Sequence, residues 1–118
     1  MDRIDYDGRR FRPVSNASHG QVNGDTVFKY HQTGDLFTAT YSGGGIRSGS
    51  MTGVAAPDGV LRFCYQHLTN AGELRSGICD SKPEILADGR IRLHEKWQWT
   101  LGEPAGSGES VVEEDVTR

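Results

Sequence analysis

Several common signals are missing from this 118-residue sequence. No segment longer than a turn or two places apolar residues at helical spacing, so we expect no long amphipathic helix. No run approaches the roughly 18 apolar residues that a membrane-spanning helix needs. The 13 basic and 16 acidic side chains are interspersed and leave a net charge of -3, so no basic block is present. We therefore expect no nucleic-acid partner and no membrane partner.

Metal and cofactor motifs are also absent from the sequence. The four histidines have no close ligand spacing, and the two cysteines, Cys64 and Cys79, do not form a CxxC pair. Gly43-Gly44-Gly45 is not followed by the GK[ST] of a P-loop, and Ser107 lacks the strand and helix that flank a nucleophile elbow. We expect no metal and no cofactor, and the sequence identifies no catalytic residue.

The first residues of the chain, 1–5, contain no apolar segment of the kind found in export signals. The sequence therefore predicts a cytoplasmic protein whose two thiols are reduced. The length of 118 residues predicts a single domain. Apolar residues make up 35% of the chain, which is enough for a sheet that buries one face.

Turn signals are abundant, by contrast, and they recur along the whole chain. They include Asn23-Gly24, Thr33-Gly34-Asp35, Pro57-Asp58-Gly59, Asn70-Ala71-Gly72 and Asp88-Gly89. Most stretches between them alternate apolar and polar residues, which is typical of antiparallel strands joined by tight turns. The pattern predicts an all-β, eight-stranded, antiparallel up-and-down barrel with strands over 3–14, 26–32, 36–42, 46–55, 60–68, 74–80, 90–100 and 109–116.

Alternation also assigns the faces of these strands. In 90–100, one face carries Leu93, Glu95, Trp97 and Trp99, and a shift by one residue would expose both tryptophans. We expect this face to point inward and both tryptophans to be largely buried. The same reasoning places Tyr30, Tyr41, Tyr65 and His67 on inner faces.

The hairpin around Ala71-Gly72 permits two registers. A four-residue loop would set Cys64 opposite Cys79 on the outer face and bury Leu74 and Ile78. A three-residue loop would instead send Arg75, Gly77 and Cys79 inward. We favour the first register, because it buries the apolar pair.

Five stretches add a resemblance to a known family. They are Tyr6-Asp7-Gly8-Arg9-Arg10-Phe11, Tyr41-Ser42-Gly43-Gly44, Gly77-Ile78-Cys79, Pro83-Glu84-Ile85-Leu86 and Glu95-Lys96-Trp97-Gln98-Trp99. Together they resemble small, uncharacterised bacterial proteins with an avidin-like, calycin-type β-barrel. The resemblance implies an eight-stranded barrel, a cavity at one mouth and a tendency to form homo-oligomers. No biotin-contacting residue can be matched onto this chain, so biotin binding is not carried over.

Members of that family often bear the name N-acetylglutamate synthase. The residues here do not support acetyltransferase activity. Such an enzyme needs a glycine-rich loop that opens a helix, whose N-terminus holds the pyrophosphate of acetyl-CoA. The glycine clusters of this chain lie between strands instead.

The leading functional hypothesis is a small-molecule binding protein with an aromatic interior. Its candidate ligand-binding residues are Tyr30, Tyr41, Tyr65, His67, Glu95, Trp97 and Trp99. Aromatic rings bury large areas and keep a polar edge that can orient a ligand. The same rings could equally fill a solid core, which would suit a structural or interaction module that acts as a homo-oligomer.

Two of these residues, Glu95 and His67, are candidates for acid–base chemistry. A buried Glu95 is either the structural partner of an inward Arg, His or Tyr, or a ligand anchor or general base. His67 is either hydrogen-bonded at the barrel rim or a ligand contact. A third hypothesis, an acid–base enzyme, would require Glu95 and His67 to meet at one cavity.

Overall fold

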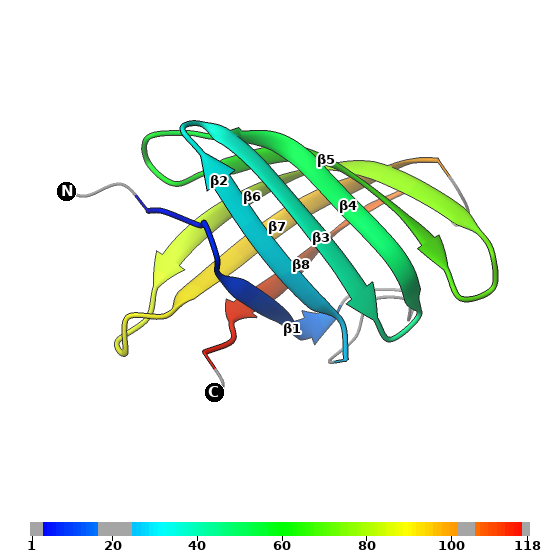
Figure 1. Cartoon of the computed structure of the whole chain (residues 1–118), viewed down its shortest axis with the longest axis horizontal. Helices are drawn as coiled ribbons and strands as arrows, with labels where there is room; N and C mark the ends of the chain where they lie inside the picture. The colour runs from blue at the N-terminus through cyan, green and yellow to red at the C-terminus, as the bar shows by residue number, and fades with distance from the viewer. Residues whose placement is uncertain (1–3, 17–24, 102–105, 117–118) are drawn as a thin grey trace.

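The structure, a computed structural model, describes residues 4–16, 25–101 and 106–116. These residues form a closed antiparallel barrel in which each strand pairs with its neighbours in sequence and β1 pairs with β8 (Figure 1). The strands are β1 (Arg10–Asn16), β2 (Val27–Thr33), β3 (Leu36–Gly43), β4 (Ile46–Ala55), β5 (Leu61–Thr69), β6 (Leu74–Ile85), β7 (Ile91–Leu101) and β8 (Ser107–Glu114). The predicted fold class, strand number and strand order are confirmed.

The tight turns form where the glycines allow them. Between β4 and β5, the amide of Ala56 donates to the carbonyl of Val60, and Gly59 has a φ of 90°. This is a three-residue loop with glycine in the left-handed position, at the turn signal Pro57-Asp58-Gly59. It sets Met51 opposite Tyr65.

The predicted start of the first strand, at residue 3, was wrong, because strand pairing begins only at Arg10. Residues 4–9 turn instead at Gly8, whose φ is 79°. This turn lets Tyr6 leave the sheet and enter the barrel, where its hydroxyl donates to the carbonyl of Gly59 at 2.6 Å. Tyr6 is completely buried.

The predicted register of the hairpin between β5 and β6 was also wrong. The pairs are Leu68 with Leu74 and Cys64 with Ile78, which is the register of the three-residue loop. Arg75, Gly77 and Cys79 therefore face inward. Cys64 is exposed on the outer face while Cys79 is buried, so the two thiols do not oppose each other.

Strand β6 extends five residues beyond its predicted end at residue 80. It continues through Pro83, which pairs with Leu93 of β7. Pairing with β5 ends at Ser81, so on that side Pro83 needs no amide hydrogen to complete a ladder. The single-sided pairing explains why a proline is compatible with this strand.

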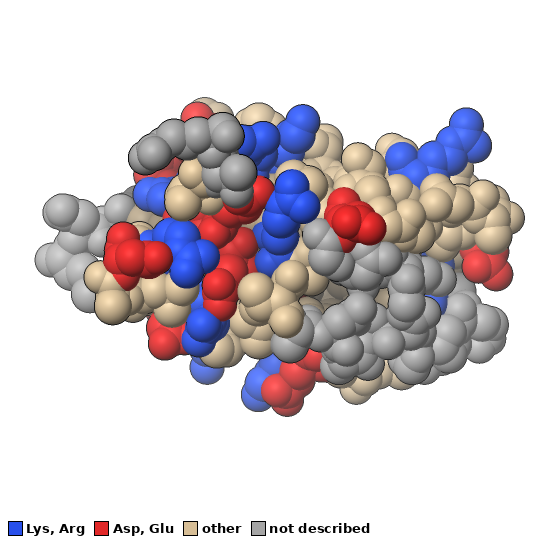
Figure 2. Space-filling model, turned by 90° about the horizontal axis from the view of Figure 1, so that it is seen from below, with Lys and Arg blue, Asp and Glu red and all other residues tan. Residues whose placement is uncertain are grey.

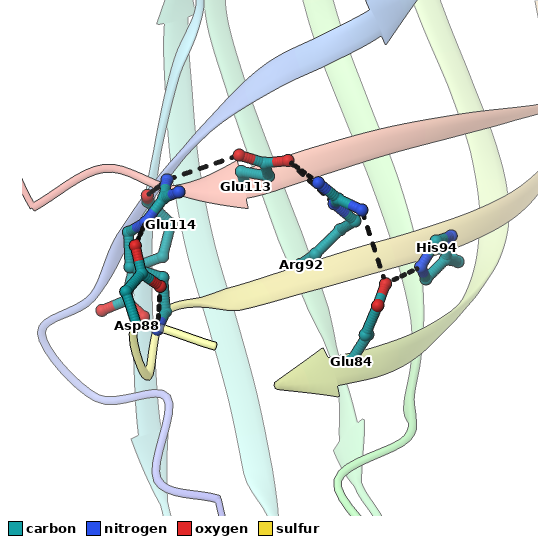
Figure 3. A network of polar contacts seen from close by, with 7 residues as sticks. Glu84, Asp88, Arg92, His94, Glu113 and Glu114 are labelled. Atoms are coloured by element: carbon teal, nitrogen blue, oxygen red, sulfur yellow. Dashed lines mark hydrogen bonds and ion pairs between the residues drawn. The ribbon is translucent and has the colours of Figure 1, made fainter. Parts of the chain in front are cut away.

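A polar network on the outside joins β6, β7 and β8 near the end of the barrel where both termini lie (Figures 1 and 3). Arg92 of β7 contacts Glu113 at 2.6 Å and Glu84 at 3.7 Å. Glu114 is buried and accepts hydrogen bonds from the Arg9 guanidinium and the Ile91 amide. These contacts tie β8 to β7 and to the loop before β1, and they also tie β7 to β6.

Candidate ligand cavity

The two ends of the barrel are filled differently. Four contacting rings pack the end that holds the termini, with centroids 4.5 to 6.5 Å apart: Tyr6, Phe11, Tyr30 and Phe37. All four are at most 1% exposed. This closed end leaves no room for a ligand, so the hollow part of the interior lies toward the other end.

A cavity of about 90 Å³ lies inside the barrel beyond this closed end. It is lined by Pro13, Phe28, Tyr41, Met51, Phe63, Tyr65, His67, Cys79, Glu95, Trp97, Trp99, Ser110 and Val112. Typical pockets for drug-sized ligands have roughly 300–1,000 Å³. The enclosed space therefore suits a very small molecule, or one end of a larger one.

Six of the seven candidate residues lie at this cavity: Tyr41, Tyr65, His67, Glu95, Trp97 and Trp99. Tyr30 does not line it, because its ring is packed against Phe11 and Phe37 in the closed end. Trp97 and Trp99 face inward as predicted, and both are partly buried and packed against the core.

Glycines on neighbouring strands make room for these large rings. A Cβ atom on Gly77 of β6 would fall 2.3 Å from the hydroxyl of Tyr65. A Cβ on Gly108 of β8 would fall 2.5 Å from the ring of Trp97. In a tapering barrel interior, small residues on one strand leave room for large side chains on the neighbouring strand. Without these glycines the rings would have to tilt into the cavity.

Glu95 lies on the inner face of β7, as predicted, and is 9% exposed. Its Oε1 accepts a hydrogen bond from the hydroxyl of Ser110 at 3.2 Å. Burial raises the pKa of the Glu95 carboxyl to about 7, and the Ser110 bond offsets only part of that shift. Within the described residues Glu95 has no ion-pair partner, so of its possible partners neither an Arg nor a His pairs with it, and a neutral hydroxyl contacts it instead.

His67 is buried, and its Nδ1 is 2.8 Å from the hydroxyl of Tyr41. Burial, together with the positive charge of Arg75, lowers the pKa of His67 to about 4. The imidazole is therefore neutral at physiological pH. Glu95 and His67 do line the same cavity, as an acid–base enzyme would require, but a neutral His67 is a weak proton donor there.

Arg75 is one of the residues of β6 for which the favoured register predicted the wrong face. It is 2% exposed, and its guanidinium carbon lies 3.7 Å from the ring centroid of Trp99. Stacking on an aromatic face stabilises a cation that has lost water. The signal that could have revealed it is the glycine at 77, which only the three-residue loop places against the Tyr65 ring.

Two polar atoms in this region have no hydrogen-bond partner within the described part of the chain. They are the hydroxyl of Tyr65 and the indole Nε1 of Trp99, and both are inaccessible to water. The two rings contact each other, with centroids 5.4 Å apart. A buried donor without an acceptor costs roughly 1–3 kcal/mol, so such atoms are rare unless something binds them.

Neither a metal centre nor a helix that could cross a membrane is found among residues 4–16, 25–101 and 106–116. On the face seen in Figure 2, acidic and basic side chains lie next to one another.

A closed barrel of eight antiparallel strands in sequence order, with one packed end and one hollow, aromatic end, places the chain among the up-and-down β-barrel proteins. The model of the family described as Avidin-like protein matches residues 4–115, and this chain belongs to that family. The predicted avidin-like resemblance is thereby confirmed. No match was found among curated proteins or among solved structures.

Proposed function

We propose that this barrel binds a small, partly apolar molecule in its hollow end. The observation that carries the proposal is the pair of donors without acceptors, Tyr65 and Trp99, at a cavity lined mainly by rings and aliphatic side chains. A ligand bearing an acceptor would satisfy these donors, and its apolar part would replace water against Phe28, Met51 and Val112. Glu95 and Ser110 offer a second polar contact deeper in the barrel.

The volume of the cavity limits the part of the ligand that is enclosed. An apolar cavity of about 150 Å³ is enough for benzene. The 90 Å³ here therefore encloses only a few non-hydrogen atoms unless the rings move. The proposed site residues are Tyr41, Tyr65, His67, Glu95, Trp97 and Trp99, and the proposal assigns no catalytic role to any of them.

Native mass spectrometry of freshly purified protein tests this proposal, because it reports a retained ligand and the oligomeric state together. We expect an extra small mass that Val112→Phe removes, since Val112 is buried against the cavity. Val54→Phe on the outer face of β4 is the matched control and should retain the mass. A bare protein mass, together with no gain in melting temperature from any small molecule in a screen, would refute the proposal.

A second candidate function, an interaction module that acts as a homo-oligomer, is supported by the outer face. Val54 and Ile78 are 43% and 48% exposed and lie along an outer groove that spans β4 to β8. Exposed apolar side chains grouped in this way are typical of interaction surfaces. A dimer mass in the same experiment, lost on Ile78→Asp, would favour this candidate.

We also propose a cytoplasmic location. It is supported by Cys64 and Cys79, which are free thiols on opposite faces of the sheet. A thiol count on denatured, non-reduced protein should find two groups.

A further inference from the structure

The deep part of the cavity carries a buried carboxylate. Glu95 is the fifth residue of β7 and lies on the inner face between Leu93, toward the closed end, and Trp97, toward the hollow end. Leu93 is completely buried, Glu95 is 9% exposed and Trp97 is only partly buried. Glu95 therefore lies where the packed part of the interior gives way to the hollow part, and its side chain lines the cavity.

The described lining of the cavity has a single charge at physiological pH. Glu95 is the one acidic side chain in that lining, which includes neither Lys nor Arg. The histidine of the lining, His67, is neutral, because burial and the charge of Arg75 lower its pKa to about 4. The cavity is thus negative whenever Glu95 is ionised. A buried carboxylate without a counter-ion is costly, so this space favours a cation over a second anion.

The carboxylate also has unused capacity for hydrogen bonds. A carboxylate has two oxygens with about four acceptor sites. Within the described residues, Glu95 accepts from the Ser110 hydroxyl, at Oε1. Ser81 lies opposite Glu95 on β6, and its buried hydroxyl has no partner in the described part of the chain. An ammonium group carries three N–H donors and no acceptor, so it matches a carboxylate flanked by two hydroxyl oxygens.

The rings around the cavity suit the same charge. Tyr41, Tyr65, Trp97 and Trp99 line it, and the negative face of an aromatic ring attracts a cation. Burial raises the pKa of Tyr41 and of Tyr65 most, and the charge of Glu95 adds to both shifts. The carboxylate therefore acts on rings of two other strands across the interior. A cation placed at Glu95 would lie in reach of the ring faces as well.

We propose that the cavity binds the end of a small primary amine, with the ammonium group at Glu95 and Ser110 and the short alkyl part among the rings. This inference rests on the proposed ligand-binding function and adds the chemical class of the enclosed end of the ligand. The cavity of about 90 Å³ is smaller than the roughly 150 Å³ that holds benzene, so a chain of a few carbons fits better than a ring. The acceptor for the Tyr65 hydroxyl and the Trp99 Nε1 belongs to the part of the ligand nearer the mouth.

Three four-carbon probes of similar shape and different charge test this class: butylamine, 1-butanol and butyrate. Each is titrated at pH 8, where Glu95 is mostly ionised, and is followed by proton–nitrogen NMR, in which the two tryptophans give two indole signals. We expect butylamine to bind roughly ten-fold more tightly than 1-butanol, the typical effect of one hydrogen bond to a charged group. Butyrate should bind most weakly, because its charge repels that of Glu95.

A matched pair of variants tests the role of Glu95. Glu95→Gln keeps the shape of the side chain and removes its charge. It should weaken butylamine binding roughly ten-fold and leave 1-butanol binding unchanged. Glu109→Gln is the control, because it removes the same charge next to Ser110 on β8 but on the exposed outer face. This variant should bind butylamine like the wild type.

Butylamine binding should also depend on pH through Glu95. The ionised fraction of a carboxyl with a pKa of about 7 falls between pH 8 and pH 5.5, so the affinity should weaken roughly thirty-fold. The other titratable groups that face Glu95 are Cys79, Tyr30, Tyr41 and Tyr65. Burial raises the pKa of each of them, so they stay neutral over this range. The affinity for 1-butanol should not change with pH.

The outer side of the same strands carries charged groups that need a control of their own. They are Asp80, Lys82, His94, Lys96 and Glu109. Histidine is the residue type among these whose charge changes between pH 5 and 8. His94 is exposed and lies 2.8 Å from Glu84. His94→Gln should therefore keep the pH dependence of the wild type, whereas Glu95→Gln should abolish it.

Each other outcome overturns the inference in a defined way. If 1-butanol or butyrate binds as tightly as butylamine, or Glu95→Gln leaves butylamine binding unchanged, the amine assignment is wrong while the proposed function stands. The same holds if no probe binds and native mass spectrometry finds a retained molecule without an amino group. If no probe binds and no mass is retained, both proposals fail. If Glu95→Gln does not fold, the order of the three probes and the pH dependence still decide the question.

Discussion

Replacing Glu95 by glutamine should change how the stability of the barrel depends on pH. Glu95→Gln keeps the shape of the side chain and removes its titration. The carboxyl has a pKa of about 7 in the folded protein, raised from the ordinary value of 4.5 by burial. The folded state therefore holds this proton more tightly than the unfolded state does.

The sign and size of the effect follow from linkage. Below pH 4.5 both states carry the proton, so Glu95 imposes no electrostatic cost on the fold. Between pH 4.5 and 7 the unfolded chain releases the proton first, and unfolding becomes progressively easier. A shift of about 2.5 pKa units corresponds to about 3 kcal/mol, which is the stability lost in full above pH 7.

Denaturant melts followed by tryptophan fluorescence at pH 4, 5.5, 7 and 8 measure this effect. We expect the free energy of unfolding of Glu95→Gln, relative to the wild type, to rise by about 3 kcal/mol from pH 4 to pH 8. Glu73→Gln, in the exposed loop after β5, is the control and should follow the wild type at every pH. A difference for Glu95→Gln that stays within about 1 kcal/mol, or that falls with pH, would show that burial does not control this carboxyl.

Three further predictions follow from the packing. In the folded protein Cys64 should react with a thiol reagent within minutes, while Cys79 should react only on unfolding, because burial raises the pKa of the Cys79 thiol. Two thiols that react equally fast would contradict the register of β6. Glu114→Gln should lower the free energy of unfolding by roughly 1–2 kcal/mol in denaturant melts, since a buried hydrogen bond to a charged group is lost. An unchanged melt would show that this carboxyl is in water. Gly77→Ala should lower the free energy of unfolding by about 1–3 kcal/mol, because the added methyl group overpacks against Tyr65. Adding Tyr65→Phe should recover part of that free energy. If the effects of the two substitutions were strictly additive, the two residues would not be in contact.

The strand order and about half of the cavity lining could be predicted from local patterns. Alternation along β7 placed Glu95, Trp97 and Trp99 on one face, and the structure has them there. A side-chain period of two is a property of the extended backbone itself, so it can be read without knowing the neighbouring strands. The degree of burial could not be read in this way, because both tryptophans are only partly buried while Leu93 on the same face is completely buried.

The position of Tyr30 shows a second limit. Alternation correctly turned its ring inward, but it does not tell how far along the barrel the interior is filled. That depends on Tyr6, which enters from the loop before β1 and completes the ring cluster with Phe11 and Phe37. The closed end is thus formed by a residue outside the sheet.

By itself, the sequence determined the all-β class, the eight strands, their order and the inward face of most of them. These follow from turn residues and from alternation, which act over a few neighbouring residues. Only the tertiary structure decided the register between β5 and β6, because both loop lengths are locally allowed. The observed register exposes Leu74 and Ile78, and in exchange it stacks Arg75 on Trp99 and sets Gly77 against Tyr65. Those contacts join residues on three strands, so no local pattern could specify them, and they hold the Tyr65 and Trp99 side chains that line the cavity.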